Sequence, residues 1–349
     1  MKIFKESIIV AFAFVGVVVG AGFATGQEIF QFFTSHGIYS LGGIAITGAI
    51  ITVGGILVLK TGYRLQSGNH SESVHYYLHP TIAKVFDLIL TVFLFSLAII
   101  MTAGGASTIH ESFGLPYWLS SLLLVILILL TLLLKFDRLI AVLGGVTPFL
   151  VAIVTMIAIY YFASGHLNFE AANHYAHHHP SMTLGWWFDG INYASLQIAA
   201  AFSFFSVMGG RLKYRQSATY GGLIGGLIIT FLLLMINLGL VTEFDQIKDV
   251  ALPSLLLAKN ISPSIGLIMS VIMILVIYNT VVGLMYAFAA RFSTPFTKKY
   301  FILIISMAIV TFICTFVGFI SLIGKVFPIM GLFGFILLIP IFYKGLKKH

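Results

Sequence analysis

The chain has 349 residues, of which 59% are hydrophobic and 9% charged, and its mean hydropathy is +1.06. This composition excludes a soluble globular protein, because apolar runs of about 20 residues recur along the sequence and match membrane-spanning helices in length. The net charge of +8 does not indicate nucleic-acid binding, since the basic residues lie mostly in short connections between apolar runs. We therefore expect an all-α polytopic membrane protein that is surrounded by lipid and has no nucleic-acid partner.

The first apolar run is interrupted at membrane depth, at Gly20-Ala21-Gly22 and again at Thr25-Gly26-Gln27-Glu28. Glycine costs about 1 kcal/mol relative to alanine in a helix interior, and a carboxylate within the membrane costs more. A broken membrane helix persists where its freed backbone groups line a cavity. The stretch Val17–Phe33 therefore predicts half of a substrate site in a secondary transporter.

Apolar runs along the chain predict ten membrane-spanning helices. They cover residues 6–35, 38–62, 84–110, 116–135, 138–163, 187–210, 218–242, 264–290, 298–317 and 320–343, with ends uncertain by a few residues. Lys2 and Lys5 before the first run resemble the start of a signal peptide, but further spans follow at once, so we expect this span to be retained.

The positions of the basic residues test the count of ten spans. With ten spans, only Lys248 and Lys259 lie in loops on one side, while Lys325 lies within the last span. All other lysines and arginines lie on the opposite side, among them Arg64, Lys135, Arg138, Arg211, Lys213, Arg215, Arg291 and the three lysines near the C-terminus. This asymmetry predicts that both termini are cytoplasmic.

A weak internal repeat relates the two halves of the chain. A shift of 179 residues overlays each span of the first half on a span of the second and places Ala21-Gly22-Phe23-Ala24 on Ala200-Ala201-Phe202-Ser203. Because each half has an odd number of spans, the second half must be inverted in the membrane. We predict two inverted five-helix repeats, at residues 1–165 and 186–345, within a single membrane domain.

Three longer loops connect the spans, at residues 64–83, 164–186 and 243–263. In the third, Pro253–Leu257 predicts a short helix packed over the entrance to the protein. The second contains His166, His174, His177, His178 and His179, but adjacent histidines in a flexible loop do not define a four-ligand site. We therefore predict no metal site other than a sodium site.

No catalytic constellation is found in the sequence. It lacks a nucleophile elbow, a phosphate-binding loop, an HExxH motif and paired cysteines, and its only cysteine is Cys314. We therefore expect neither an enzyme nor an organic cofactor. Without an ATP-binding loop, transport must use an ion gradient or be passive.

Candidate substrate-binding residues lie in spans 1, 3 and 6, where small or hydroxyl-bearing side chains gather. Freed N–H groups at the start of the outer half of span 1 suit a carboxylate, and the small residues and hydroxyls of span 6 predict a second helix break. The alternative is that these small residues only permit close helix packing. The predicted substrate-binding residues are Gly20, Ala21, Gly22, Phe23, Thr25, Thr102, Ala201, Phe202, Ser203 and Ser206.

An ion site is predicted from the polar pair Asn279-Thr280, halfway along the otherwise apolar span 8. Their oxygens can coordinate a desolvated cation together with carbonyls freed near Val17 and Gly20. The alternative is that the Thr280 hydroxyl donates to the backbone of its own helix.

Glu28 is the only carboxylate well inside an outer half-helix. It can accept a proton during symport or act as a gate, attract a substrate amine, or pair with Lys325. The alternative is that Glu28 lies high enough in the membrane to reach external water. We predict a functional role for this carboxylate.

The segment VGAGFATGQEIFQFF, at Val19–Phe33, resembles the YkvI-type bacterial membrane proteins, relatives of the amino acid–polyamine–organocation transporters. The five-plus-five plan is similar to the leucine-transporter fold over nearly the whole chain. The resemblance implies a bacterial plasma-membrane transporter, without specifying its substrate. It also implies unwound segments at Gly20-Ala21-Gly22 and Ala201–Ser206 and a sodium site formed by Val17, Gly20, Asn279 and Thr280.

Two hypotheses about function follow, one for a transporter and one for a receptor. The first is sodium- or proton-coupled symport of a small amino-acid-like or zwitterionic solute by alternating access, in which spans 1, 2, 6 and 7 rock against the remainder. Some proton-coupled relatives place a lysine of span 5 in the sodium site. Span 5 has no lysine here, which favours sodium, whereas Glu28 leaves protons open. The second is a nutrient receptor built on a transporter fold; a channel ranks third, and the sequence specifies no oligomeric state.

Overall fold

The computed structural model describes residues 2–67, 70–133, 147–165, 167–179, 184–293 and 297–348, and these residues contain helices but no strands. The start of the predicted fifth span, with Lys135 and Arg138, and His166 lie outside the described residues. The helices are α1 (Lys2–Val18), α2 (Ala21–Thr25), α3 (Gln27–Phe32), the 3-10 helix η1 (Thr34–Tyr39), α4 (Ser40–Leu65), α5 (His70–Tyr77), α6 (Pro80–Phe113), α7 (Tyr117–Leu133), α9 (Thr147–Ser164), α10 (Phe169–His178), α11 (Trp186–Gly210), α12 (Arg215–Thr242), α13 (Phe244–Ile247), α14 (Pro253–Ile261), α15 (Pro263–Phe292), α16 (Lys298–Thr315) and α17 (Phe319–Lys348).

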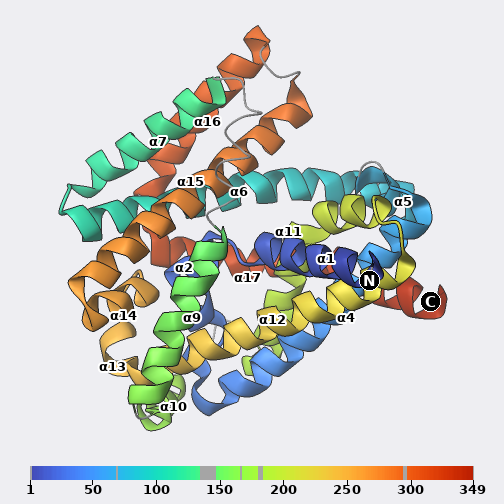
Figure 1. The fold of residues 1–349 in the computed structure, drawn as a ribbon. Helices are drawn as coiled ribbons and strands as arrows, with labels where there is room; N and C mark the ends of the chain where they lie inside the picture. The colour runs from blue at the N-terminus through green and yellow to red at the C-terminus, as the bar shows by residue number, and fades with distance from the viewer. Residues whose placement is uncertain are drawn as a thin grey trace.

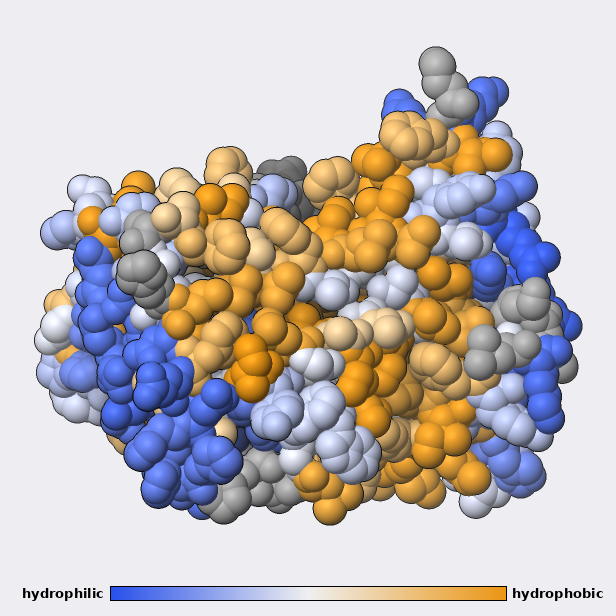
Figure 2. Space-filling view, turned by 90° about the horizontal axis from the view of Figure 1, so that it is seen from below, coloured by the Kyte–Doolittle hydropathy of each residue, from blue (hydrophilic) through white to orange (hydrophobic). Residues whose placement is uncertain are grey.

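Seven of the described helices are long and apolar enough to cross a membrane, and α7 and α9 add two shorter apolar helices. Large apolar side chains point outward from several of them, such as Val92 at 59% and Ile309 at 56% exposure. Hydrophobic residues dominate the middle of the face in Figure 2, and hydrophilic residues gather toward its ends. The prediction of an all-α, multi-pass membrane protein is confirmed.

The long helices pack in two groups. In the first, α11 lies along α4, and α1 lies along α12, which also packs against α4. In the second, α6 packs against α15 and α7, and α16 contacts both α6 and α7. Figure 1 shows the two termini close together near α5, whereas α10, α13 and α14 lie at another end of the molecule. We call the side that carries both termini the terminal face.

The first predicted span is broken twice, as expected. The backbone leaves the α-helix after Val18, and Gly20 is extended, with φ −94° and ψ −164°. A single turn, α2, then ends at Gly26, which has φ +76°, before α3 begins. The Thr25 hydroxyl donates to the carbonyl of Gly22 at 2.9 Å and accepts from the N–H of Gln27 at 3.3 Å. This side chain therefore replaces helical hydrogen bonds at the second bend.

The predicted break at Ala201–Ser206 is wrong, because α11 is one continuous α-helix from Trp186 to Gly210. The physical reason lies in the composition of the segment. Ala199–Ala201 are strong helix formers, and no glycine or proline interrupts the sequence between Ile191 and Met208. A small residue permits close packing without requiring the backbone to unwind.

The short helix predicted at Pro253–Leu257 is present as α14, which runs to Ile261 and contacts α2 and α3. Its Ser254 lies directly against Gly26, and a Cβ built on that glycine would overlap the serine hydroxyl. Gly26 is therefore required twice, by its left-handed backbone and by the close approach of α14.

Candidate functional site

A cavity of about 90 Å³ lies beside the first break in the chain. It is bordered by α1 and α2 from the broken helix and by residues of α3, α6, α11, α15 and α17. Apolar side chains form much of its wall, including Phe93 and Phe327. Its polar groups come from the extended glycine backbone and from three side chains: Glu28, Gln197 and Thr280.

Glu28 is the principal charged group of this cavity. The residue is only 5% exposed, and the Tyr193 hydroxyl donates a hydrogen bond to its Oε2 at 3.2 Å. The carboxylate folds back over the polypeptide, so that a Cβ built on Gly22 would overlap it. Glycine at this position therefore makes room for the carboxylate within the broken helix.

Among the described residues, no lysine or arginine lines this cavity. Lys325, one of the predicted partners of Glu28, is exposed, and no ion pair between the two residues is recorded. A desolvated carboxylate without a cationic neighbour is costly to maintain as an anion. The arrangement can therefore accept a proton or a cationic group that enters through the cavity.

Several predicted substrate residues of the first half use their polar groups within the protein. Gly20 and Gly22 line the cavity, and Ala21 begins α2. Phe23 is in the core. Thr25 secures the second bend, and Thr102, which is fully buried, donates to the carbonyl of Ala98 at 2.7 Å.

The predicted substrate residues of α11 point in different directions. Ala201 and Phe202 are buried, and the Phe202 ring packs edge-on against Tyr77 at 6.1 Å between centroids. Ser206 is fully buried and donates to the Ser73 hydroxyl of α5 at 2.6 Å. Ser203 alone lines a second cavity.

The residues predicted for a sodium site line two different cavities. Gly20 and Thr280 border the cavity beside the break, whereas Asn279 borders a separate, apolar cavity of about 480 Å³, and Val17 lines both. The Thr280 hydroxyl donates to the carbonyl of Val276 at 2.8 Å, the alternative considered for this residue. Its oxygen lone pairs remain available to a cation.

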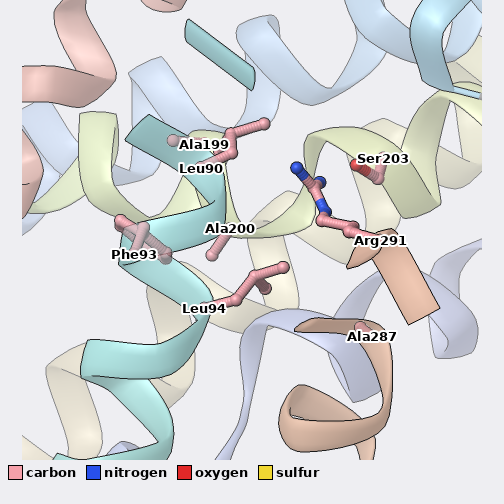
Figure 3. Close-up of a pocket in the computed structure, with 8 residues that line it drawn as sticks. All are labelled: Leu90, Phe93, Leu94, Ala199, Ala200, Ser203, Ala287 and Arg291. Carbon is pink, nitrogen blue, oxygen red and sulfur yellow. The ribbon is translucent and has the colours of Figure 1, made fainter. Parts of the chain in front are cut away.

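The second cavity, of about 320 Å³, is lined by residues of α6, α11 and α15, and we call it the vestibule (Figure 3). The two cavities share Phe93 and Ala200 as lining residues. The far end is marked by Arg291, which lies one residue before the end of α15. Because Arg291 contacts Asp87 near the start of α6, beside α5, the vestibule lies on the side of the terminal face.

Two functional candidates were missed from the sequence. Tyr193, which donates to Glu28, lies within the span of α11, where a tyrosine gives no distinctive signal. Arg291 was interpreted only as a loop charge that reports orientation. Gln197 also lines the cavity, one helical turn after Tyr193.

Two proteins of Bacillus subtilis are similar to this chain over most of its length. No protein-family model matches the chain. The uncharacterized protein YyaD of Bacillus subtilis is 25% identical over 327 residues, covering 93% of this chain and 92% of that protein. The uncharacterized membrane protein YkvI of the same organism is 24% identical over 326 residues, covering 92% of this chain and 91% of that protein. The resemblance to YkvI-type membrane proteins is confirmed.

Solved structures with a similar fold include a transporter and a symporter. The manganese transporter of Eremococcus coleocola, in complex with an aromatic bis-isothiourea substituted compound, has a TM-score of 0.61 at 12% identity, covering 97% of this chain and 78% of that one. The inward-facing conformation of Mhp1 has a TM-score of 0.60 at 14% identity, covering 96% and 75%. A substrate-bound, outward-open Na⁺-coupled sialic acid symporter has a TM-score of 0.55 at 13% identity, covering 98% and 86%. At this identity the likeness establishes the fold, which is of the leucine-transporter type.

Proposed function

We propose that the protein is a secondary active transporter that moves a small amino-acid-like or zwitterionic solute by alternating access. The observation that carries the proposal is the cavity beside the broken helix, which the buried Glu28 carboxylate lines and which adjoins the vestibule. A buried charge and freed backbone groups beside a cavity are typical of a transport site rather than of a structural anchor. The transporter fold of the similar structures supports the same function.

The conformation is consistent with a carrier open toward the terminal face. The vestibule lies on that side of the break, while α14 packs on Gly26 on the other side. The basic residues concentrate on the terminal face, so the proposal places that face in the cytoplasm of a bacterial plasma membrane. The vestibule is then the route by which a solute reaches the cell interior.

The repeat proposed from the sequence gains support from helix packing. Under the shift of 179 residues, α4 corresponds to α12 and the broken first span to α11. The observed neighbours are exchanged accordingly, since α1 packs on α12 and α11 packs on α4. We propose ten spans in two inverted halves, at residues 1–165 and 186–345, with helix 1 broken and helix 6 continuous.

The coupling ion is proposed to be sodium or a proton, and the two differ in the residue that responds. A proton would bind Glu28, the buried carboxylate of the cavity. Sodium would use the Thr280 hydroxyl with carbonyls near Val17 and Gly20, because hard cations favour oxygen ligands. Proton coupling therefore requires the Glu28 side chain, whereas sodium coupling requires that of Thr280.

The test is uptake into liposomes that contain the purified full-length protein. Amino acids, amines and organic acids are screened under an inward sodium gradient, a proton gradient, or potassium alone. We expect accumulation with one gradient only. Glu28→Gln should abolish proton-driven uptake, and Thr280→Ala should raise the sodium concentration needed for half-maximal uptake by about 10-fold, the effect of losing about 1.4 kcal/mol. Glu170→Gln, an exposed carboxylate of α10, is the control.

Two outcomes would contradict parts of the proposal. Binding of a solute without accumulation under either gradient would contradict transport and favour the nutrient-receptor alternative. Unchanged uptake in Thr280→Ala, together with thermal stability that does not respond to sodium, would exclude the sodium assignment.

A further inference from the structure

Among the described residues that line the vestibule, Arg291 is the one that carries a formal charge, and apolar walls surround it. The other lining residues of the vestibule are six apolar residues and one hydroxyl, that of Ser203 on α11. In Figure 3 the guanidinium of Arg291 extends from α15 into the space between α6 and α11. The volume, about 320 Å³, is within the range of about 300–1,000 Å³ that is usual for small-molecule sites.

The guanidinium is held in place through one of its three nitrogens. Nη1 donates to the backbone carbonyl of Asp87 at 3.0 Å, to Asp87 Oδ1 at 2.9 Å and to Thr91 Oγ1 at 2.8 Å. All three acceptors lie on α6, across the cavity from Ser203. Within the described part of the chain, no hydrogen bond is recorded for Nη2 or Nε of Arg291. An arginine fork needs two adjacent N–H groups to bind a carboxylate with both oxygens, and Nη2 and Nε form such a pair.

The Asp87 carboxylate only partly balances the positive charge of the Arg291 guanidinium. Its side chain is 57% exposed, against 20% for Arg291, so water screens the carboxylate more than the guanidinium. No carboxylate lines the vestibule itself in the described residues. Apolar walls of low dielectric focus the remaining positive potential into the cavity, where it attracts anions.

We propose that the vestibule is a binding site for the carboxylate group of a small solute, anchored by Arg291. The inference rests on the proposed function, in which this cavity is the exit route, and it narrows the substrate class to solutes that carry a carboxylate. Glu28 lines the cavity beside the break, and Arg291 lines the adjoining vestibule. A zwitterion therefore meets a negative group at the break and a positive group on the way out.

The probe is propionate, with uncharged propionamide as the matched compound at the same ionic strength. Saturation-transfer NMR on the purified full-length protein in detergent measures the apparent Kd of each. We expect Arg291→Gln to weaken propionate binding by at least about 10-fold, and Arg291→Lys to weaken it less, because an ammonium keeps the charge but lacks the fork. Propionamide should not bind measurably, and empty micelles give the background.

Two further variants distinguish an anion-binding role of Arg291 from a purely structural ion pair with Asp87. Arg211→Gln removes the same residue type from the exposed end of α11, away from the vestibule, and should leave binding unchanged. Asp87→Asn removes the charge that competes for Arg291 and should tighten propionate binding by about 2- to 5-fold. If the pair only fastens α6 to α15, Asp87→Asn and Arg291→Gln break the same contact and change binding in the same direction.

The proposal is overturned if Arg291→Gln binds propionate as the wild type does, if propionamide binds equally well, or if Asp87→Asn weakens binding or leaves it unchanged. Should Arg291→Gln fail to purify as a monodisperse protein, Asp87→Asn alone decides. Failure of the proposed function is a separate result. Propionate binding that depends on Arg291, with no solute accumulated in liposomes, would preserve the anion site and contradict transport.

Discussion

Gly22 and Glu28 depend on each other, because the carboxylate occupies the space that any larger side chain at position 22 would need. We predict that Gly22→Ala displaces Glu28 from the cavity wall and abolishes uptake. Overpacking of this kind destabilises by about 1–3 kcal/mol, so the thermal midpoint should also fall. Transport assays and thermal unfolding in detergent measure the two effects.

Gly20→Ala is the matched control for this prediction. A Cβ at Gly20 has no heavy atom within 4 Å and would project into open space. The same added methyl group should therefore leave the thermal midpoint close to that of the wild type. Equal destabilisation by both variants would show that the glycines serve backbone flexibility rather than the seating of Glu28.

The Tyr193 hydroxyl donates a hydrogen bond to the Glu28 carboxylate, and both side chains are buried. We predict that Tyr193→Phe lowers the rate of uptake by about 10-fold, since a hydrogen bond to a charged group contributes about 1.5–3 kcal/mol. Tyr220→Phe, at an exposed position of α12, should have no effect. If uptake in Tyr193→Phe equals that of the wild type, the hydrogen bond does not position the carboxylate.

At the scale of residues, the sequence was informative where a residue type is unusual for a membrane-spanning helix. A carboxylate and closely spaced glycines within an apolar run identified Glu28 and the glycines around it. Tyr193 and Arg291 gave no such signal, because a tyrosine within a span and an arginine at its end are ordinary there. Only the helix packing shows that Tyr193 reaches Glu28 and that Arg291 lines a cavity.

At the scale of elements, the contact between α14 and Gly26 joins a short helix of the second half of the chain to the broken span. We predict that Gly26→Ala lowers the thermal midpoint more than Gly114→Ala does. Both glycines have positive φ, so both variants incur the left-handed penalty of about 1 kcal/mol, but only Gly26 has a neighbour that the new methyl group would overlap. Thermal unfolding of the two variants measures the difference.

Removing the neighbour checks the cause. In Gly26→Ala combined with Ser254→Ala, the overlapping hydroxyl is gone, and part of the lost stability should return. If the double variant is no more stable than Gly26→Ala, the destabilisation arises from the backbone alone.

The elements also show where sequence reasoning failed. The break in the first span was predictable because Gly20, Gly22 and Gly26 weaken the helix and Thr25 offers an alternative hydrogen-bond partner. The break in α11 was predicted from its small residues and hydroxyls and from the family resemblance, although its alanines favour a helix. Correspondence between repeats predicts position in the fold, but local composition decides whether the helix unwinds.

At the scale of the whole molecule, the side on which the vestibule opens can be tested by labelling. We predict that Ser203→Cys, in a Cys314→Ser background, reacts with a membrane-impermeant maleimide applied to the terminal face. Ser203 lines the vestibule, and an apolar route that admits a solute also admits the reagent. Inside-out and right-side-out vesicles compare the two faces, and a tag at either terminus identifies the terminal face.

Ser206→Cys is the matched control, since Ser206 lies one turn further along α11, is fully buried and is bonded to Ser73. It should remain unlabelled from both faces. Labelling of Ser203→Cys from the opposite face only would contradict the proposed direction of opening.

For the molecule as a whole, hydropathy predicted the membrane class and the approximate positions of the long helices, because lipid imposes length and composition on every span. It did not predict which helices separate to form the vestibule. That depends on packing between segments far apart in sequence, such as α6, α11 and α15, and no periodicity within one segment records it.

Through Ser254, the short helix α14 contacts the broken first span. This helix is not one of the long apolar helices, and Ser254 abuts the glycine at which the first span bends for the second time. An antibody fragment that binds α14 and moves it away from Gly26 would remove the contact at this bend without entering the bilayer. A ligand too large to pass through the protein could thus change the conformation of the broken span by displacing α14.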